Sequence, residues 1–148
     1  PYYGATGIMD YVDDFIFDGE YILLAEDGSV MDEYGFPIVQ FIWGKNWVNN
    51  HAHVIQSNNK KVLEFVYQTL KMIPVVLIKT GSIQMKINQE NLLNYKVLLP
   101  PDVLINSYSS MADKTRKMLI NNIEENSKLS ELRDWLLPML MNGQVTVN

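Results

Sequence analysis

The chain has no cysteine and only two histidines, which narrows the chemistry open to it. Without cysteine it has no disulfides, thiolate ligands or cysteine nucleophiles, and the composition suits a reducing cytosol, so we expect a cytoplasmic protein. It has no run of eighteen apolar residues, so we expect no membrane-spanning helix and no membrane partner. The G-x-S-x-G, G-x-G-x-x-G and phosphate-loop patterns of common enzymes are also missing.

Basic residues are absent from the first 44 positions, where nine Asp and Glu give a net charge of −9. Residues 45–100 hold seven Lys and two Glu, a net of +5, and residues 101–148 hold five basic and six acidic groups, a net of −1. Phosphate binding depends on a local basic face more than on the total charge, which is −5 here. The middle third can therefore supply a nucleic-acid surface.

Up to Leu99 the chain has the pattern of short strands and turns around one helix. The β-branched and aromatic runs "EYILLA" (20–25) and "VQFIW" (39–43) predict strands, and Asp27-Gly28 and Asn58-Asn59 predict turns. In "KKVLEFVYQTLKMI" (60–73) the apolar residues recur at helical spacing. We therefore expect an α+β domain over residues 1–100, with a curved mixed β-sheet and short helices.

After Pro100-Pro101 the pattern changes to a heptad seam, in which apolar residues recur at steps of four and three. Asp102 is a candidate cap for a helix over roughly residues 102–137. We expect Pro138 to end or kink this helix, and Asn142-Gly143 to turn the chain into a short strand, "QVTV" (144–147). Residues 101–148 are therefore predicted to form a long helix with a terminal strand.

The predicted helix is too long to be covered by one small domain. Thirty-odd residues span about 50 Å at ~1.5 Å per residue, whereas a domain of about 100 residues is only ~26 Å across. The seam therefore needs a second helix, and we predict assembly through it. The seam residues chosen for this role are Leu104, Met111, Met118, Leu129, Leu132 and Leu136.

The histidines, His51 and His53, stand one residue apart and would point the same way from a strand. With carboxylates they could hold a metal for hydrolysis, and the early acids are Asp13, Asp14, Asp18, Glu20, Glu26 and Asp27. A restriction-nuclease core usually carries Lys two residues beyond its acidic ligand, but Gly28 stands there after Glu26. We favour one buried, hydrogen-bonded histidine ring and expect no metal, no cofactor and no catalytic residue. A metal-dependent hydrolase stays open as an alternative.

In "KTGSIQMKIN" (79–88) apolar and polar residues alternate, as in a half-exposed strand. Asn and Gln pair with adenine, and Lys reaches guanine or phosphate, so this strand is a candidate DNA surface. Its polar face consists of Ser82, Gln84, Lys86 and Asn88. We place Lys45 and Lys79 on phosphates and Gln84 on a base. An ordinary solvated strand shows the same alternation.

Four segments, taken in order, resemble the DNA specificity subunit of type I restriction–modification systems. They are "PYYGATGIMDYVDDFIFDGEYILLAEDGS" (1–29), "WVNNHAHVI" (47–55), "TGSIQMKIN" (80–88) and "LSELRDWLLPMLMNGQVTV" (129–147). The resemblance covers nearly the whole chain and implies a target recognition domain followed by a spacer helix. This sequence corresponds to one half of such a subunit, without the strands that normally precede "PYYGATG". Since the chain begins at Pro1, we expect it to be a fragment of a longer protein.

The resemblance implies a non-catalytic prokaryotic protein that binds double-stranded DNA. It also implies docking of methyltransferase (modification) subunits and, through them, the restriction subunit. The spacer helix is expected to pair antiparallel with a second one, from the other half of the subunit or from a dimer mate. Asn49 and Asn50 then join the candidate DNA contacts. The remaining alternative is a protein-interaction module whose helix binds partners without DNA readout.

Overall fold

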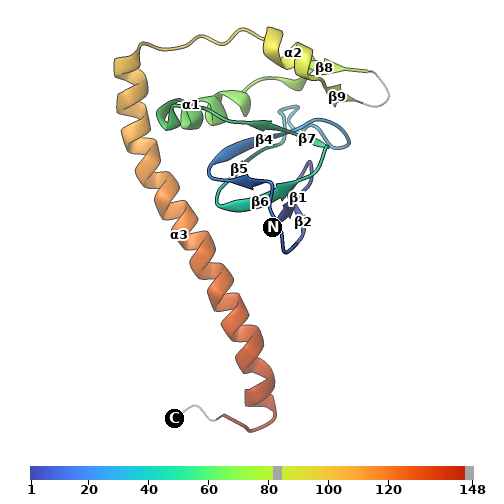
Figure 1. Ribbon diagram of the computed structural model, residues 1–148, viewed down its shortest axis with the longest axis vertical. Coiled ribbons are helices and arrows are strands. Elements are labelled where there is room, and N and C mark those ends of the chain that lie inside the picture. The colour runs from blue at the N-terminus through green and yellow to red at the C-terminus, as the bar shows by residue number, and fades with distance from the viewer. Residues whose placement is uncertain (82–84, 146–148) are drawn as a thin grey trace. The chain divides into compact units, whose positions relative to one another are not determined.

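The computed structural model describes residues 1–81 and 85–145 and contains two compact units, Pro1–Ser109 and Ser110–Asn148. The strands, all in the first unit, are β1 (Tyr2–Tyr3), β2 (Ile8–Asp10), β3 (Phe17–Asp18), β4 (Tyr21–Ala25), β5 (Val39–Ile42), β6 (Lys45–Val48), β7 (Ala52–Ile55), β8 (Lys79–Thr80) and β9 (Lys86–Ile87). The helices are α1 (Lys60–Leu70), the short 3-10 helix η1 (Val75–Leu77), α2 (Gln89–Asn94) and α3 (Asp102–Met141). The fold is α+β, as predicted (Figure 1). None of the helices in the described ranges is long and apolar enough to cross a membrane.

The strands of the first unit form three small sheets. An antiparallel sheet has the order β5-β4-β7, and a mixed sheet has the order β2-β1-β6-β3, in which β1 and β6 run parallel. The strands β8 and β9 form an antiparallel hairpin, with Lys79 opposite Ile87 and Thr80 opposite Lys86.

Strand β4 is the centre of the first unit because both of its faces are buried. Ile22 and Leu24 belong to a core cluster that also receives Leu63 and Leu70 from α1. Leu23 points to the opposite face and packs with Ile42 in a second cluster. A continuous apolar run is what a strand buried on both faces requires, so the predicted strand at 20–25 is confirmed. The predicted strand at 39–43 and the helix at 60–73 are also confirmed, as β5 and α1.

Local side chains fix where these elements begin and end. Asn59 precedes α1, and its side chain accepts a hydrogen bond from the Lys61 amide, as an N-cap should. Gly28, in the turn after β4, has a φ of 75°, a conformation that favours glycine.

α1 lies across β4 and β5 and covers one side of their sheet (Figure 1).

The expectation of one strand over residues 79–88 is wrong, because the segment folds back on itself as the β8–β9 hairpin. Gly81 has a φ of 79°, in the left-handed region that turns use and strands do not. Residues 82–84 lie outside the described residues. Asn88 does not continue the strand but is the N-cap of α2, where its side chain accepts a hydrogen bond from the Asn91 amide at 2.8 Å.

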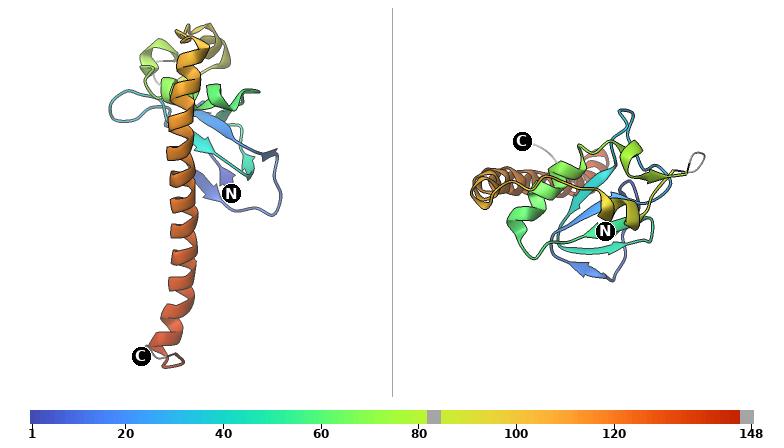
Figure 2. Two further views of the ribbon diagram at one scale, coloured as in Figure 1. Left: turned by 90° about the vertical axis from the view of Figure 1, so that its left-hand side faces the viewer. Right: turned by 90° about the horizontal axis from the view of Figure 1, so that it is seen from above.

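The predicted long helix is confirmed as α3, a single continuous helix in the left view of Figure 2. Its ends differ from the prediction. Asp102 is its first residue rather than its cap, and the Pro101 carbonyl accepts from the Leu104 and Ile105 amides. Pro138 does not end the helix, which continues to Met141.

The first two turns of α3 belong to the first unit and pack on α1. Ile105 and Ser109 are buried there. The Ser109 hydroxyl donates to the Lys61 carbonyl at 3.2 Å, and Lys61 Nζ donates to Asn106 Oδ1 at 3.0 Å. In the second unit, Gln144 and Val145 do not form the expected strand, and residues 146–148 lie outside the described residues.

Candidate nucleic-acid interface

The two histidines lie beside the end of β4, where Glu26 and Asp27 follow the strand directly. Strand β7 pairs antiparallel with β4, so that His53 stands opposite Leu24. The Glu26 amide donates to the His51 carbonyl at 2.9 Å, which extends this pairing by one residue. Each histidine therefore comes within reach of one of the two carboxylates.

His51 is bound to Asp27, which holds a second partner as well. Nδ1 of His51 lies 2.7 Å from Oδ1 of Asp27, and Nζ of Lys86 lies 3.4 Å from Oδ2 of the same carboxylate. Asp27 thus joins the β4–β7 pair to the β8–β9 hairpin. Sequence reasoning had treated Asp27 only as a turn residue or a metal ligand, and it gave no sign of this link across 59 residues.

His53 makes the second connection to the hairpin. Its Nε2 lies 2.6 Å from the Ile87 carbonyl oxygen, and its Nδ1 lies 3.7 Å from Oε2 of Glu26. Because a carbonyl only accepts, Nε2 must carry a proton. The His53 side chain is 15% exposed, which fits the expected buried, hydrogen-bonded ring.

Of the carboxylates proposed as metal ligands, Glu26 and Asp27 lie beside the histidines, whereas Glu20 and Asp14 have other partners. Glu20 pairs with Lys60 at 3.1 Å, and Asp14 accepts a hydrogen bond from the Phe15 amide. In the described part of the chain, no group of three or more His, Asp or Glu side chains could hold a metal ion. The geometry therefore offers the hydrolase alternative no metal site among those residues.

Three of the predicted DNA contacts gather around the hairpin base and its Asp27 anchor. Lys86 pairs with Asp27, Lys79 Nζ lies 3.7 Å from Met85 Sδ, and Asn88 caps α2. Ser82 and Gln84 lie outside the described residues.

The other three predicted contacts lie on or next to β6. Lys45 starts that strand, with Nζ 4.7 Å from the centre of the Phe15 ring. Asn49 Oδ1 accepts from the His51 amide at 3.0 Å, and this contact braces the turn before β7. Asn50 is exposed, and its side chain finds no hydrogen-bond partner in the part of the chain that the structure describes.

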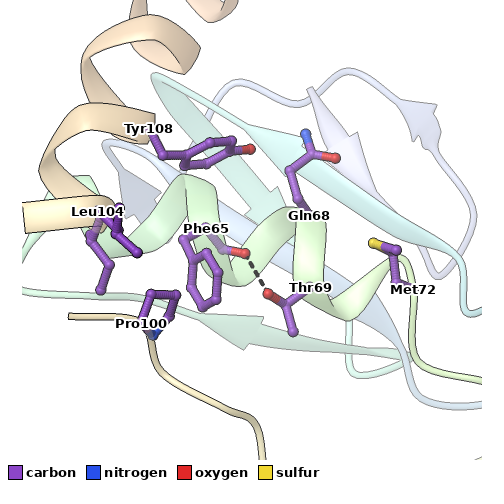
Figure 3. Close-up of a pocket in the computed structure, with 8 residues that line it drawn as sticks. Phe65, Gln68, Thr69, Met72, Pro100, Leu104 and Tyr108 are labelled. Carbon is purple, nitrogen blue, oxygen red and sulfur yellow. Dashed lines mark hydrogen bonds between the residues drawn. The ribbon is translucent and has the colours of Figure 1, made fainter. Parts of the chain in front are cut away.

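A separate apolar groove of about 470 Å³ lies within the first unit, between α1 and the start of α3. In Figure 3, Leu104 and Tyr108 of α3 face Phe65 of α1, with Pro100 and Thr69 beside it. Leu104, predicted as the first residue of the helix seam, is thus a wall of this groove and 60% exposed. The other five residues proposed for the seam lie in the second unit.

Comparison with known proteins identifies the first unit. Residues 1–105 match the model of the type I restriction modification DNA specificity domain. The chain is 35% identical over 102 residues to a putative type I restriction enzyme specificity subunit of Haemophilus influenzae; the match covers 68% of this chain and 26% of that protein. It is 26% identical over 136 residues to the MjaIX type I restriction enzyme specificity subunit of Methanocaldococcus jannaschii, covering 89% of this chain and 31% of that protein.

These relatives are much longer than the chain, which spans less than a third of the length of either. The match to the specificity domain nevertheless takes in β1 to β9 and the first turn of α3, and so includes the hairpin and its anchoring residues. The resemblance stated from the four segments is confirmed. The chain belongs to the type I restriction–modification DNA specificity family.

Proposed function

We propose that this chain recognises DNA as part of the specificity subunit of a type I restriction–modification complex. The observation that carries the proposal is the family match over residues 1–105. This stretch contains the basic middle third of the sequence and the hairpin fixed to β4 and β7. In this proposal residues 1–100 are the target recognition domain and residues 101–148 the spacer.

Polar residues of segment 79–88, and polar residues on or directly after β6, are the proposed DNA contacts. Lys45 and Lys79 neutralise phosphates, whose contacts position the protein without reading sequence. Gln84 reads a base edge, for which the side-chain amide is suited. The other proposed contacts are Asn49, Asn50, Ser82 and Asn88. Lys86, the remaining predicted contact, is paired with Asp27 and is not among them.

The spacer supplies assembly rather than readout. In the second unit Met111, Met118, Leu129 and Leu132 are between 48% and 72% exposed. Exposed apolar side chains in a heptad register favour a second helix as partner. We propose that this helix comes from another recognition half or a dimer mate, and that the pair docks the modification subunits. The chain itself is proposed to be non-catalytic.

Duplex titration of a reconstituted specificity–modification complex at two salt concentrations tests the DNA part. Gln84→Ala should cost about 1–3 kcal/mol on the cognate site and relax preference at one base pair. Lys45→Ala and Lys79→Ala should weaken all sequences alike, each reducing the salt slope by about one unit.

The same titration tests the alternative of an interaction module without DNA readout. That alternative would be favoured if the complex assembles normally but binds duplexes without sequence preference. Duplex affinity would then also be the same in Gln84→Ala, Lys45→Ala and Lys79→Ala as in the wild type. The helix would then be the active part and the sheets its scaffold.

A further inference from the structure

We infer that Asp27, His53 and Lys86 are positioning residues that hold the β8–β9 hairpin in place for DNA readout. The inference rests on the proposed function and adds to it three side chains whose contacts are made within the protein. Together they would fix the position of the hairpin relative to β4 and β7, while other residues contact the DNA.

The hairpin cannot hold itself in place. Each of its strands pairs over only two residues, and isolated two-stranded hairpins are marginally stable at best. Its base must therefore be anchored from outside. Asn91 contributes on the β8 side, where its side-chain amide donates to the carbonyls of Ile78 and Lys79 at 3.3 and 3.4 Å.

The anchor on the β9 side is Ile87, which is fully buried. Its amide donates to the Glu26 carbonyl at 2.8 Å, and its carbonyl accepts from His53 Nε2 at 2.6 Å. Both of its backbone polar groups are thus satisfied by the β4–β7 pair. Removal of the His53 ring would leave a buried carbonyl without its partner, which is costly.

Asp27 acts on the neighbouring residue of the hairpin. One of its oxygens accepts from His51, in the turn before β7, and the other faces Lys86 of β9, so one carboxylate links two separate segments. The Lys86 charge is therefore paired within the protein. This contact assigns Lys86 to positioning rather than to a phosphate.

Hydrogen exchange in the full chain, without DNA, tests the anchor directly. His53→Ala should raise the exchange rate of the Ile87 amide at least about tenfold, and His53→Gln should restore part of the protection because its amide can donate to the same carbonyl. Asp27→Asn and Lys86→Met should each give a smaller increase, since their pair is partly exposed. The matched control is the Glu20–Lys60 pair, where Glu20→Gln and Lys60→Met should leave Ile87 unchanged. Unchanged exchange in His53→Ala would overturn the inference.

Duplex titration of the reconstituted complex then tests the role in readout. Neutralising an acidic group near DNA normally strengthens binding, because repulsion of the phosphates is removed. If Asp27 positions the hairpin, Asp27→Asn should instead weaken cognate binding and lower the ratio of cognate to single-mismatch affinity about threefold or more. Asp27→Asn with Lys86→Met should be no worse than either change alone.

The two experiments separate this inference from the proposed function. If the wild-type complex shows no sequence preference, the proposed function fails, and with it the readout role of these residues, whatever the exchange data show. If the wild type discriminates but Asp27→Asn strengthens cognate binding, or the double variant is additive, only the positioning role is overturned.

Discussion

The two units of this chain use apolar side chains in opposite ways. In the first unit, residues such as Ile22, Leu23 and Leu24 are completely buried. In the second, none of residues 110–145 is buried, although the helix carries leucines and methionines throughout. The first unit is thus specified by its own core, whereas the helix presents apolar surface of the kind that a partner covers.

The largest effect is expected from changing the exposed apolar side chains of the second unit. Leu129→Asp with Leu132→Asp should abolish helix-mediated assembly, because two charges would replace two central apolar contacts, each worth about 2 kcal/mol or more. Sedimentation of the reconstituted complex should show the loss of the larger species. Ser127→Asp with Ser130→Asp, off the seam on the same helix, is the matched control, and equal assembly in both pairs would contradict the proposed seam.

In the first unit, Leu23→Ala should lower the free energy of unfolding by about 2–5 kcal/mol, because it opens a cavity beside Ile42. Chemical denaturation measures the loss. Leu93→Ala is the control, since Leu93 is 74% exposed and should change stability little. A small effect at Leu23 would mean that β4 is not the core strand.

A smaller effect is expected at the start of α1. Asn59→Ala removes the side-chain oxygen that accepts from the Lys61 amide and should cost about 1 kcal/mol of stability. Asn58→Ala, one residue earlier and outside the cap, should be close to neutral in the same denaturation experiment. Equal losses in the two variants would argue against the capping role.

The smallest effect is expected from the ionisation of Tyr3, in the first unit, at high pH. Burial, with a further contribution from Tyr11, raises the pKa of Tyr3 above its usual value of about 10. The folded state therefore favours the neutral form of Tyr3. The stability that depends on this neutral form is fully present below pH 10 and is lost as the pH rises through the pKa of Tyr3 in the folded state. Absorbance titration should show that Tyr3→Phe removes a tyrosine that ionises above its usual range, and the decline in stability above pH 10 should become shallower.

The sequence predicted those parts of the fold whose signals are local. The apolar run at 20–25 and the helical spacing at 60–73 each describe one element by itself, and both elements formed. The helix after Pro101 was likewise readable from its heptads. Its extension past Pro138 was not, because the rule that proline ends helices competes with a favourable sequence on both sides of it.

The candidate site was harder to predict because its contacts join distant residues. The alternation in 79–88 was mistaken for one strand, although Gly81 was a turn signal within it. His53 and Ile87 are 34 residues apart, so neither residue's neighbours announce the hydrogen bond between them. The sequence patterns identified the histidines and carboxylates as candidate site residues. Their position beside the hairpin depends on the pairing of β4 with β7, which no local pattern predicts.

Strand β4 has one further consequence, which concerns cooperativity. A protein with two core clusters can in principle melt one and keep the other. Here consecutive residues of one strand supply both, Leu23 to one cluster and its neighbours Ile22 and Leu24 to the other. Neither cluster can open without displacing the backbone that holds the other, so β4 couples the unfolding of the two clusters. The sheet that carries the hairpin should therefore unfold in one step with the rest of its unit, with no half-melted state in which the hairpin loses its foundation.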